Sequence, residues 1–214
     1  MSTRRKPALR IVGTAPQTSG TNQRRRQSEI LDAAAKVFAQ RGYYGASTQD
    51  IADILGIKQA SLYYYFPSKE IALERVCMKG VEGFFEAATA VAAQKITASQ
   101  KVRGLVQAHL APLIDRADFV KTFLNERQYL PPASRKKVGK LSRAYEKVIE
   151  KVLAEGVKSG EFRKDADPRL MALAMLGMCK SVAAWLGKDD AYQVPTIAEE
   201  YSRIVLGGIS RSGK

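Results

Sequence analysis

Apolar residues recur at steps of three and four positions along most of this chain, which is the spacing of one face of an α-helix. Near the C-terminus they occupy nearly every face, as expected of helices that are covered on most sides. The pattern predicts an all-α fold of about nine helices. Their expected ranges are 24–41, 49–55, 59–66, 69–95, 99–116, 118–128, 133–156, 168–186 and 195–209.

The pattern changes between residues 47 and 69, where a break separates two short helices. Ser47 is placed to cap the first helix, and Asp50 three residues later completes a capping-box spacing. Gly56 has no Cβ and therefore permits a sharp turn. Pro67 should end the second helix. A helix, a short turn that contains glycine and a second helix are the plan of a DNA-binding helix-turn-helix.

The net charge supports this hypothesis. Lys and Arg number 35 against 21 Asp and Glu in 214 residues, so the formal net charge is +14 and the pI is about 9.8. A basic surplus of this size indicates a polyanionic partner, with nucleic acid first. An anionic membrane surface or an anionic metabolite would also account for part of it. The plain alternative is a basic protein without such a partner, which the helix-turn-helix pattern argues against.

The cysteines and the apolar runs indicate a compartment. Cys77 and Cys179 are the only cysteines and lie far apart inside helical patterns, so neither a disulfide framework nor a zinc spacing is present. No apolar run is long enough to span a membrane. The basic N-terminus lacks the hydrophobic segment of a signal peptide. We therefore expect a cytoplasmic protein.

Composition and pattern divide the chain into three regions. Residues 1–22 mix basic residues with Pro, Gly, Ser and Thr without a period, which predicts a disordered basic arm. Such an arm either attracts phosphates or is only a leader. Residues 23–68 should form a three-helix head that contains the helix-turn-helix. Residues 69–214 should form a helical body.

The last two helices, 168–186 and 195–209, carry more apolar surface than one body of this size requires. Gly177, Gly207 and Gly208 allow helices to approach closely. Two helices from each of two copies can pack as a four-helix bundle, which would bury the surplus. The alternative is that they only close the core of a monomer.

Several features between residues 25 and 75 occur in a fixed order. They are Phe38 and Gly42 near the end of the first helix, Tyr43 or Tyr44, Ser47-Thr48 before Asp50-Ile51-Ala52, Gly56-Ile57, the run LYYYF at 62–66, and Ser68-Lys69-Glu70. This ordered set resembles the N-terminal domain of TetR-family transcriptional regulators. The chain departs from the pattern at Ala60, where many members carry Gly or Pro, and at Tyr65, where many carry His.

The resemblance implies a ligand-responsive transcriptional repressor. Such a protein binds an inverted-repeat operator in double-stranded DNA as a homodimer and is released by a small effector. The resemblance also favours the interpretation that helices 168–186 and 195–209 pair with those of a second copy, and not that they only close the core of a monomer. Residues 69–214 then become a ligand-binding and dimerisation domain.

The second helix of the motif, 58–65, should lie in the major groove. Gln59 is the best candidate for a base edge, because its amide both donates and accepts hydrogen bonds, as adenine requires. Ala60 and Ser61 are small enough for close approach, and Ala60 can touch a thymine methyl group. The other expected DNA contacts are Arg25, Gln49 and Lys58, together with the phosphate partners Thr48, Tyr63, Tyr64, Tyr65 and Lys69. One of the three tyrosines should pack partly into the core.

The body resembles the TetR subgroup that represses fatty-acid and steroid-ring breakdown and responds to acyl-CoA thioesters. The features are Arg143 with Tyr145-Glu146, the segment EGVKSGEFRKDADP at 155–168, and LGMCKSVAAWL at 176–186 before Pro195. Many members carry an Asn and a Trp where residues 179–182 stand here. An acyl-CoA needs an apolar slot and cations for its phosphates. The expected slot residues are Leu105, Val106, His109, Phe119, Phe123 and Met175, and the expected cations are Arg127 and the basic side of helix 133–156.

The same residues argue against other classes of function. His109 is the only histidine, and no Ser-His-Asp set, catalytic carboxylate pair, phosphate loop or metal cluster can be assembled. We therefore expect that the protein is not an enzyme and that it binds no cofactor and no metal. One alternative is a multidrug-type TetR regulator that responds to another hydrophobic small molecule, whose pocket should contain buried acidic residues. Another is an architectural DNA binder without a ligand, which would show no ligand-dependent release.

Overall fold

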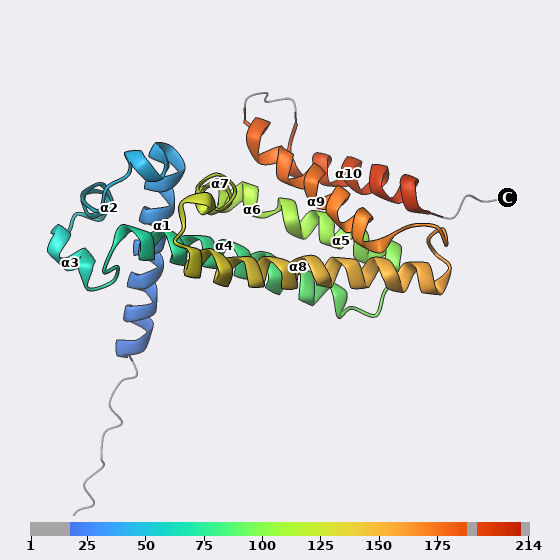
Figure 1. Cartoon of the computed structure of the whole chain (residues 1–214), viewed down its shortest axis with the longest axis horizontal. Coiled ribbons are helices and arrows are strands. Elements are labelled where there is room, and N and C mark those ends of the chain that lie inside the picture. Colours follow the sequence, from blue (N-terminus) through green and yellow to red (C-terminus); the bar gives the residue numbers. More distant parts are fainter. Residues whose placement is uncertain (1–17, 188–191, 211–214) are drawn as a thin grey trace, which may run out of the picture.

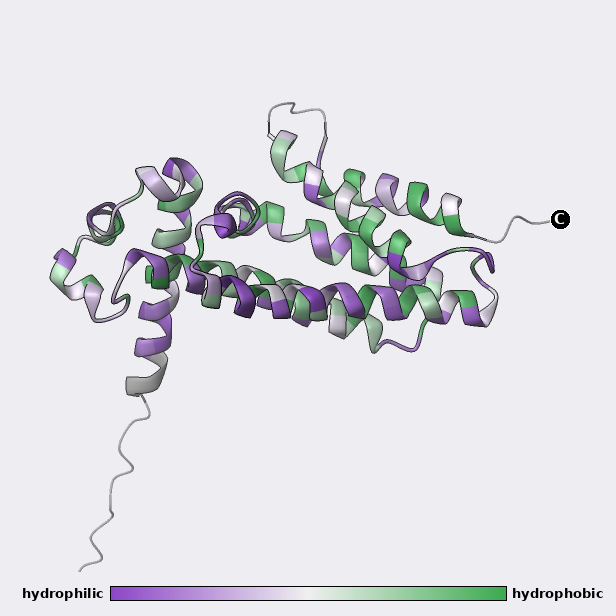
Figure 2. Cartoon of the chain, viewed as in Figure 1, coloured by the Kyte–Doolittle hydropathy of each residue, from purple (hydrophilic) through white to green (hydrophobic). Residues whose placement is uncertain are grey.

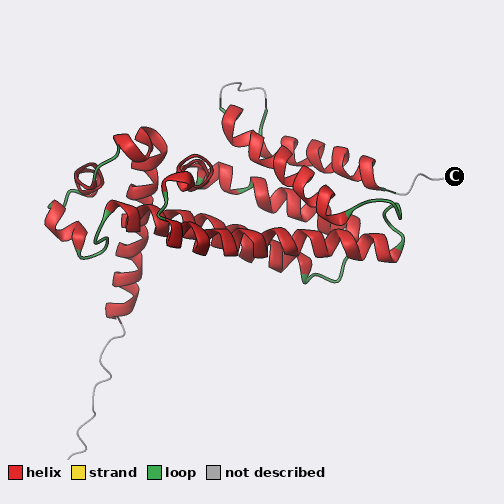
Figure 3. Cartoon of the chain, viewed as in Figure 1, coloured by secondary structure: helices red, strands yellow, loops and turns green. Residues whose placement is uncertain are grey.

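The computed structural model describes residues 18–187 and 192–210, and the side chains from residue 22 (Figure 1). These residues form helices joined by short loops, and no strand occurs among them (Figure 3). An isolated antiparallel bridge pairs Phe162 with Ser210. Each of the nine expected helical ranges has a counterpart, so the predicted all-α fold is confirmed. Within the described part, no helix is both long and apolar enough to cross a membrane.

The head consists of α1 (Thr18–Gly45), α2 (Thr48–Leu55) and α3 (Gln59–Tyr63), at the left of Figure 1. The predicted capping box is present. The Asp50 amide donates to Ser47 Oγ at 3.1 Å, and the Ser47 amide donates to Asp50 Oδ2 at 2.8 Å. Gly56 ends α2 with a φ of 62°, the left-handed region that glycine adopts without a steric cost. These local signals set the angle between α2 and α3.

The limits of α1 differ from the expectation. The helix begins at Thr18, so residues 18–22 of the predicted disordered arm are helical, while residues 1–17 lie outside the described residues. The expected stop at Gly42 is a kink with a φ of 67° and a ψ of 172°, after which one more helical turn runs to Gly45. Glycine therefore bends this helix instead of ending it.

The recognition helix is shorter than the expected 58–65 range. Lys58 is its N-terminal cap residue with an extended backbone, and α3 ends at Tyr63. The amides of Tyr65 and Phe66 both donate to the Leu62 carbonyl at 2.9 Å, which tightens the chain into a turn. This turn places Phe66 in the core before Pro67, and the burial of its ring accounts for the early end of the helix.

The body contains the remaining helices. They are α4 (Lys69–Ala92), α5 (Ala98–Leu110), α6 (Pro112–Asp115), α7 (Ala117–Glu126), the 3-10 helix η1 (Arg127–Tyr129), α8 (Pro132–Ser159), α9 (Pro168–Trp185) and α10 (Val194–Ile209). The long helices α4 and α8 lie side by side (Figure 1). Helix α5 packs against α4, α8, α9 and α10 and forms the centre of the body. Pro112 begins the short helix α6 and separates it from α5, because proline has no amide hydrogen to continue the helix.

Two hydrophobic cores meet at α7. One core belongs to α5, α8, α9 and α10 and includes Val120 of α7. The other is the core of the head, and it also contains Phe119 and Phe123 of α7 and Leu130 and Val138 beyond it. The head therefore does not end at residue 68 in physical terms, because body residues complete its core.

A polar pair is buried in the body. Nδ1 of His109 lies 2.6 Å from the Tyr145 hydroxyl oxygen, and both rings stack with Phe84. Burial, assisted by the charge of Lys180, lowers the pKa of His109 to about 3. Burial also raises the pKa of Tyr145 far above its ordinary range. Both groups are therefore neutral near pH 7.

The loop after α8 is held by close packing at Gly156. A Cβ added at Gly156 would lie 2.1 Å from Cε2 of Phe162 and 2.9 Å from the Cβ of Ala98. Phe162 is fully buried, and its amide donates to the Gly156 carbonyl at 3.0 Å. We predict that Gly156→Ala lowers the free energy of unfolding by ~1–3 kcal/mol, because the Phe162 ring has to move. Urea unfolding measures this loss.

Gly83→Ala in α4 is the matched control, because a Cβ at this position meets no atom within 4 Å. It should leave the stability unchanged or raise it by up to ~1 kcal/mol, since alanine favours the helix. Equal effects of the two substitutions would contradict the packing assigned to Phe162.

The buried imidazole predicts a pH dependence of stability. Because the pKa of His109 is lowered on folding from 6.5 to about 3, the unfolded chain binds the extra proton first. The contribution of neutral His109 to the free energy of unfolding is fully present above pH 6.5 and is lost as the pH falls toward 3. We expect a loss of ~2 kcal/mol between pH 8 and pH 5. The double variant His109→Phe/Tyr145→Phe should lack this loss. If urea unfolding of the variant shows the same dependence on pH as the wild type, the buried neutral state is contradicted.

Candidate DNA-binding surface and effector pocket

The outer surface of α2 and α3 exposes most of the residues that were predicted to contact DNA. Gln49, Lys58, Ala60, Ser61, Tyr63 and Tyr64 are exposed, while Thr48, Gln59, Tyr65 and Lys69 are partly buried. The side chains of Leu62 and Phe66 face the core instead. Six of the predicted residues are therefore exposed on the head, and hydrogen-bond distances join Thr48, Gln59 and Tyr63.

Hydrogen bonds hold the polar residues of this surface in place. Gln59 donates from Nε2 to Thr48 Oγ1 at 2.7 Å, and this oxygen lies 3.4 Å from the Tyr63 hydroxyl. Gln49 donates from Nε2 to Asp53 Oδ1 at 2.6 Å. The Oε1 atom of Gln59 and the second Nε2 hydrogen are still available to a base edge. The contact with Thr48 fixes the orientation of this amide.

The three tyrosines have different environments. Tyr63 and Tyr64 are 46% and 78% exposed, so both hydroxyl groups can reach a ligand outside the head. Tyr65 packs against the head core, and its carbonyl accepts a hydrogen bond from Arg75 at 2.9 Å. Tyr65 is the tyrosine that belongs partly to the core.

Two of the three predicted basic contacts, Lys69 and Arg25, are already engaged within the chain. The ammonium group of Lys69 donates to the carbonyls of Tyr43 at 2.9 Å and Ala46 at 3.0 Å, so it joins α4 to the end of α1. One of its three hydrogens remains for a phosphate. Arg25 is exposed and pairs with Glu29 at 3.2 Å. Exposed pairs of this kind are weak, so this arginine can exchange partners.

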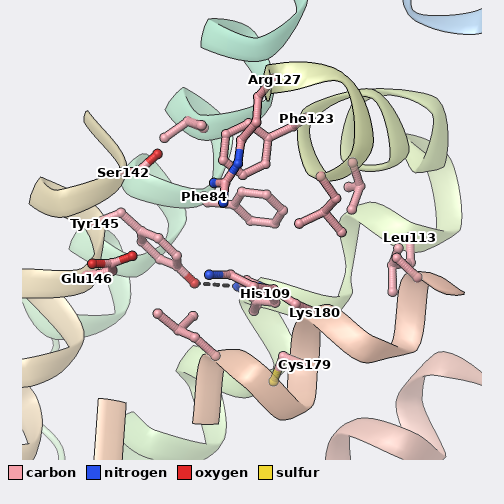
Figure 4. A pocket seen from close by; sticks show the side chains of 15 residues that line it. Phe84, His109, Leu113, Phe123, Arg127, Ser142, Tyr145, Glu146, Cys179 and Lys180 are labelled. Carbon is pink, nitrogen blue, oxygen red and sulfur yellow. Dashed lines mark hydrogen bonds between the residues drawn. The ribbon is translucent and has the colours of Figure 1, made fainter. Parts of the chain in front are cut away.

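A cavity opens in the body between α4, α5, α7, α8 and α9 (Figure 4). Its volume is about 30 Å³, which holds one or two water molecules. The apolar lining residues are Val81, Phe84, Leu113, Val120, Phe123, Leu124, Leu176, Cys179 and Ala183, and the polar ones are His109, Arg127, Ser142, Tyr145, Glu146 and Lys180. The cavity is thus small in this structure, and a larger ligand requires its walls to move.

Three of the predicted ligand-binding residues line this cavity, namely His109, Phe123 and Arg127. The other four do not. Leu105, Val106 and Met175 are buried in the body core, and Phe119 belongs to the head core. Their positions follow from the packing angles of α5, α7 and α9, which apolar spacing alone does not define.

Sequence reasoning missed Tyr145, Glu146 and Lys180 as lining residues. A usable signal existed for Lys180, because it is a single charge inside the apolar run of α9. Tyr145 lies on the apolar face of α8, where its polar tip requires a partner. No sequence signal distinguishes Glu146 from its charged neighbours on α8.

Two cations and one carboxylate, namely Arg127, Lys180 and Glu146, line the cavity and are at least partly exposed. Burial lowers the pKa of Lys180, Glu146 opposes this shift, and the charge of Arg127 adds to it. The guanidinium of Arg127 lies 5.0 Å from the centre of the Phe123 ring. An adjoining groove between α7 and α9 is lined by Lys121 and Lys180. The net charge of this region is positive, which suits an anionic ligand.

Helix α7 connects the cavity to the head. Phe123 of α7 lines the cavity, while Thr122 donates from Oγ1 to the Ala35 carbonyl of α1 at 3.1 Å. Oε2 of Glu126 accepts a hydrogen bond from the Tyr43 amide at 2.7 Å, directly after the kink of α1. The ring of Tyr129 stacks on that of Tyr43 with centroids 5.6 Å apart. A shift of α7 must therefore disturb the end of α1.

Helices α9 and α10 leave an apolar face uncovered in the single chain, and hydrophobic residues recur along both (Figure 2). Leu170, Leu173 and Ile204 are 63%, 46% and 51% exposed. In the part of the chain that the structure describes, no atom lies within 4 Å of a Cβ added at Gly177, Gly207 or Gly208. Large exposed apolar side chains beside uncovered glycines are typical of a surface that pairs with another helix. Among the described residues, no cluster of metal-ligating side chains occurs.

The chain matches two family models. Residues 95–209 match the model described as "Tetracyclin repressor-like, C-terminal domain", and residues 30–76 match "Bacterial regulatory proteins, tetR family". The second match covers the helix-turn-helix. The first covers the apolar face of α9 and α10 and all cavity-lining residues except Val81 and Phe84 of α4.

Individual proteins show the same likeness over nearly the whole chain. The HTH-type transcriptional repressor KstR2 of Rhodococcus jostii (strain RHA1) is 29% identical over 197 residues, which cover 92% of this chain and 96% of the relative. The solved TetR-family regulator PfmR of Thermus thermophilus is 30% identical with a TM-score of 0.78, covering 85% and 99% of the two chains. FadR of Bacillus subtilis, solved with stearoyl-CoA, has a TM-score of 0.73 at 24% identity and covers 85% and 98%. This last likeness concerns the fold.

The predicted resemblance and the predicted class of function are confirmed by these matches. Operator DNA, a second copy of the chain and a small-molecule effector are the partners of TetR repressors. The family models together account for the head and for more than half of the chain in the body. This chain belongs to the TetR family of bacterial transcriptional regulators and is a DNA-binding repressor of the TetR type.

Proposed function

We propose that this repressor binds an inverted-repeat operator as a homodimer and leaves it when an acyl-CoA thioester enters the cavity of the body. The observation that carries the proposal is the double role of α7, whose Phe123 lines the cavity while its Glu126 and Thr122 hold α1. The cavity has a volume of only about 30 Å³, so a ligand has to push its walls apart. Moving α7 then changes the position of the head.

The dimer follows from the uncovered face of α9 and α10. Leu170, Leu173 and Ile204 expose apolar surface that a second copy would bury. Two-fold pairing places two copies of α3 on one side of the DNA, and half-sites about one helical turn apart fit such an arrangement. A change in the angle between head and body alters this spacing in both copies at once.

The chemistry of the cavity supports an anionic thioester with an apolar acyl group. Aromatic and aliphatic side chains form most of the lining, whereas Arg127 and Lys180 add two positive charges to it. Lys121 extends the positive region along the groove between α7 and α9. Phosphate groups of coenzyme A can pair with these cations. A protein of the same fold, FadR of Bacillus subtilis, was solved with stearoyl-CoA.

The alternative effector is another hydrophobic molecule, as in multidrug-type regulators. A cationic drug requires unpaired acidic groups in the pocket. Glu146 is the acidic residue in the lining, and the pKa of Lys180 responds to both Glu146 and Arg127. With two cations beside one carboxylate, the cavity favours anions over cations.

We further infer that the protein catalyses no reaction and works in the cytoplasm, where its operator is located. Its relatives are transcriptional regulators, and His109 is neutral and hydrogen-bonded to Tyr145. A turnover assay with acyl-CoA tests the first inference, since release of free coenzyme A would contradict it.

The effector proposal is tested by a gel shift on the DNA upstream of the gene with a panel of acyl-CoA thioesters. At least one thioester should release the DNA at micromolar concentration, and free coenzyme A should not. Hydrophobic cations of the multidrug type serve as the comparison. Release by the cations alone would favour the alternative.

Gln59→Ala should weaken binding to the operator by ~1–3 kcal/mol and relax the preference at one base position, because the amide no longer reaches a base edge. Gln107→Ala is the control, since Gln107 is an exposed glutamine of α5 in the body and is not among the expected DNA contacts, so operator binding should be unchanged. Binding is measured by fluorescence anisotropy on the operator and on its single-base variants. An equal loss on every sequence would rule out base reading by Gln59.

Glu126→Ala should reduce the coupling between effector and operator by about 1 kcal/mol, out of the ~1–3 kcal/mol that is usual for such coupling. The Tyr43 amide then loses its acceptor, so movement of α7 is passed to α1 less directly. Operator affinity is measured with and without the thioester that releases wild-type protein best. Glu126→Gln keeps an acceptor oxygen at this position and should retain most of the coupling. Full coupling in Glu126→Ala would exclude this route.

A further inference from the structure

The His109–Tyr145 pair is a polar feature in a cavity whose lining is mainly apolar (Figure 4). His109 comes from α5 and Tyr145 from α8, and their polar atoms are 2.6 Å apart. Phe84, Leu176 and Cys179 also line this cavity. Burying two polar side chains costs free energy that two apolar residues of the same shape would not. Packing alone therefore does not explain why these two polar side chains are buried here.

One nitrogen of the imidazole has no partner among the described residues. Nδ1 is bound to Tyr145, and no hydrogen bond from Nε2 to a described residue occurs. Every fully enclosed side-chain nitrogen or oxygen in the described part of the chain has a partner. Nε2 is therefore not fully enclosed, and because His109 lines the cavity it has access to that space.

The pair is neutral, and this makes its hydrogen-bonding role adaptable. When the Tyr145 hydroxyl donates to Nδ1, the imidazole proton is on Nε2, which then donates into the cavity. When Nδ1 carries the proton and donates to the tyrosine oxygen, Nε2 becomes an acceptor, and the tyrosine hydroxyl hydrogen is available to a ligand. The pair can thus bind a carbonyl oxygen in one arrangement and a hydroxyl group in the other.

We propose that the His109–Tyr145 pair selects effectors that place an oxygen atom, as a carbonyl or a hydroxyl group, inside the mainly apolar cavity. The proposal rests on the function proposed above and adds a specificity element to it. Two sources of this oxygen are chemically equivalent at the pair, namely the thioester carbonyl itself and a second oxygen farther along the acyl group. A site that binds a ligand oxygen disfavours the analogue without it, because its own polar groups then stay unpaired.

The test uses matched probes that differ by an oxygen. Hexanoyl-CoA is compared with S-hexyl-CoA, which lacks the carbonyl, and 3-hydroxyhexanoyl-CoA and 3-oxohexanoyl-CoA are compared with hexanoyl-CoA. Octan-2-one and octane form a third comparison without coenzyme A. Affinities are measured by calorimetry on wild-type protein and on the double variant with Phe at His109 and Tyr145, which keeps the ring shapes and leaves neither partner unpaired.

Because His109 is the only histidine of the chain, ¹⁵N-histidine labelling gives the signals of one imidazole. We expect wild-type protein to prefer the oxygen-bearing member of at least one pair by about 10-fold, which corresponds to one additional hydrogen bond. Its binding should also shift the Nε2 resonance. The double variant should lose the preference, and its thermal unfolding curve shows whether it is folded. The pair of probes that responds identifies the source of the oxygen.

An equal affinity for both members of every pair would overturn the proposal. So would a preference that survives in the double variant, or an imidazole resonance that no probe shifts. If octan-2-one is preferred over octane and moves the His109 signals while no thioester binds, the acyl-CoA function fails and the role of the pair stands.

Discussion

The structure depends on the packing of α7 between two hydrophobic cores. Phe119 and Phe123 complete the core of the head, whereas Val120 on the adjacent position belongs to the core of the body. The polar contacts of α7 also reach the head, since Thr122 and Glu126 each accept or donate a hydrogen bond with α1. Protein interiors are close-packed, so one core cannot change its volume at α7 without a response from the other. A ligand that enters the body is thereby connected to the DNA-binding surface.

Residues of both α4 and α7 form hydrogen bonds with the end of α1. Tyr43 donates its amide hydrogen to Glu126 and its hydroxyl hydrogen to Glu70 of α4, while its carbonyl accepts from Lys69. Burial and the carboxylate of Glu70 raise the pKa of Tyr43 to about 12, so its phenol stays protonated and keeps donating. The kink at Gly42 frees the Tyr43 amide from the regular hydrogen bonding of the helix. Movements of α4 and α7 therefore converge on the segment that carries α2 and α3.

Short-range sequence patterns predicted the helices and the cap of the head well. They predicted only some of the residues that line the cavity. Ser47 and Asp50 form the expected cap because both partners lie within one turn of each other in sequence. The early end of α3 was not predictable, since it results from the burial of Phe66 in a core that body residues complete. The lining residues depend on the angles between five helices. His109 and Arg127 were predicted from their chemical type, whereas Glu146 lies on a face of α8 that only the packed body defines.

The most direct test of this account is hydrogen exchange of the amides of α1 and α7, measured by mass spectrometry with and without an acyl-CoA thioester that releases the operator. We expect faster exchange at the amide of Tyr43 and along the Gly42–Gly45 turn when the thioester binds, because the Glu126 contact is loosened. Release of the operator with unchanged exchange in this segment and in α7 would contradict the role assigned to α7.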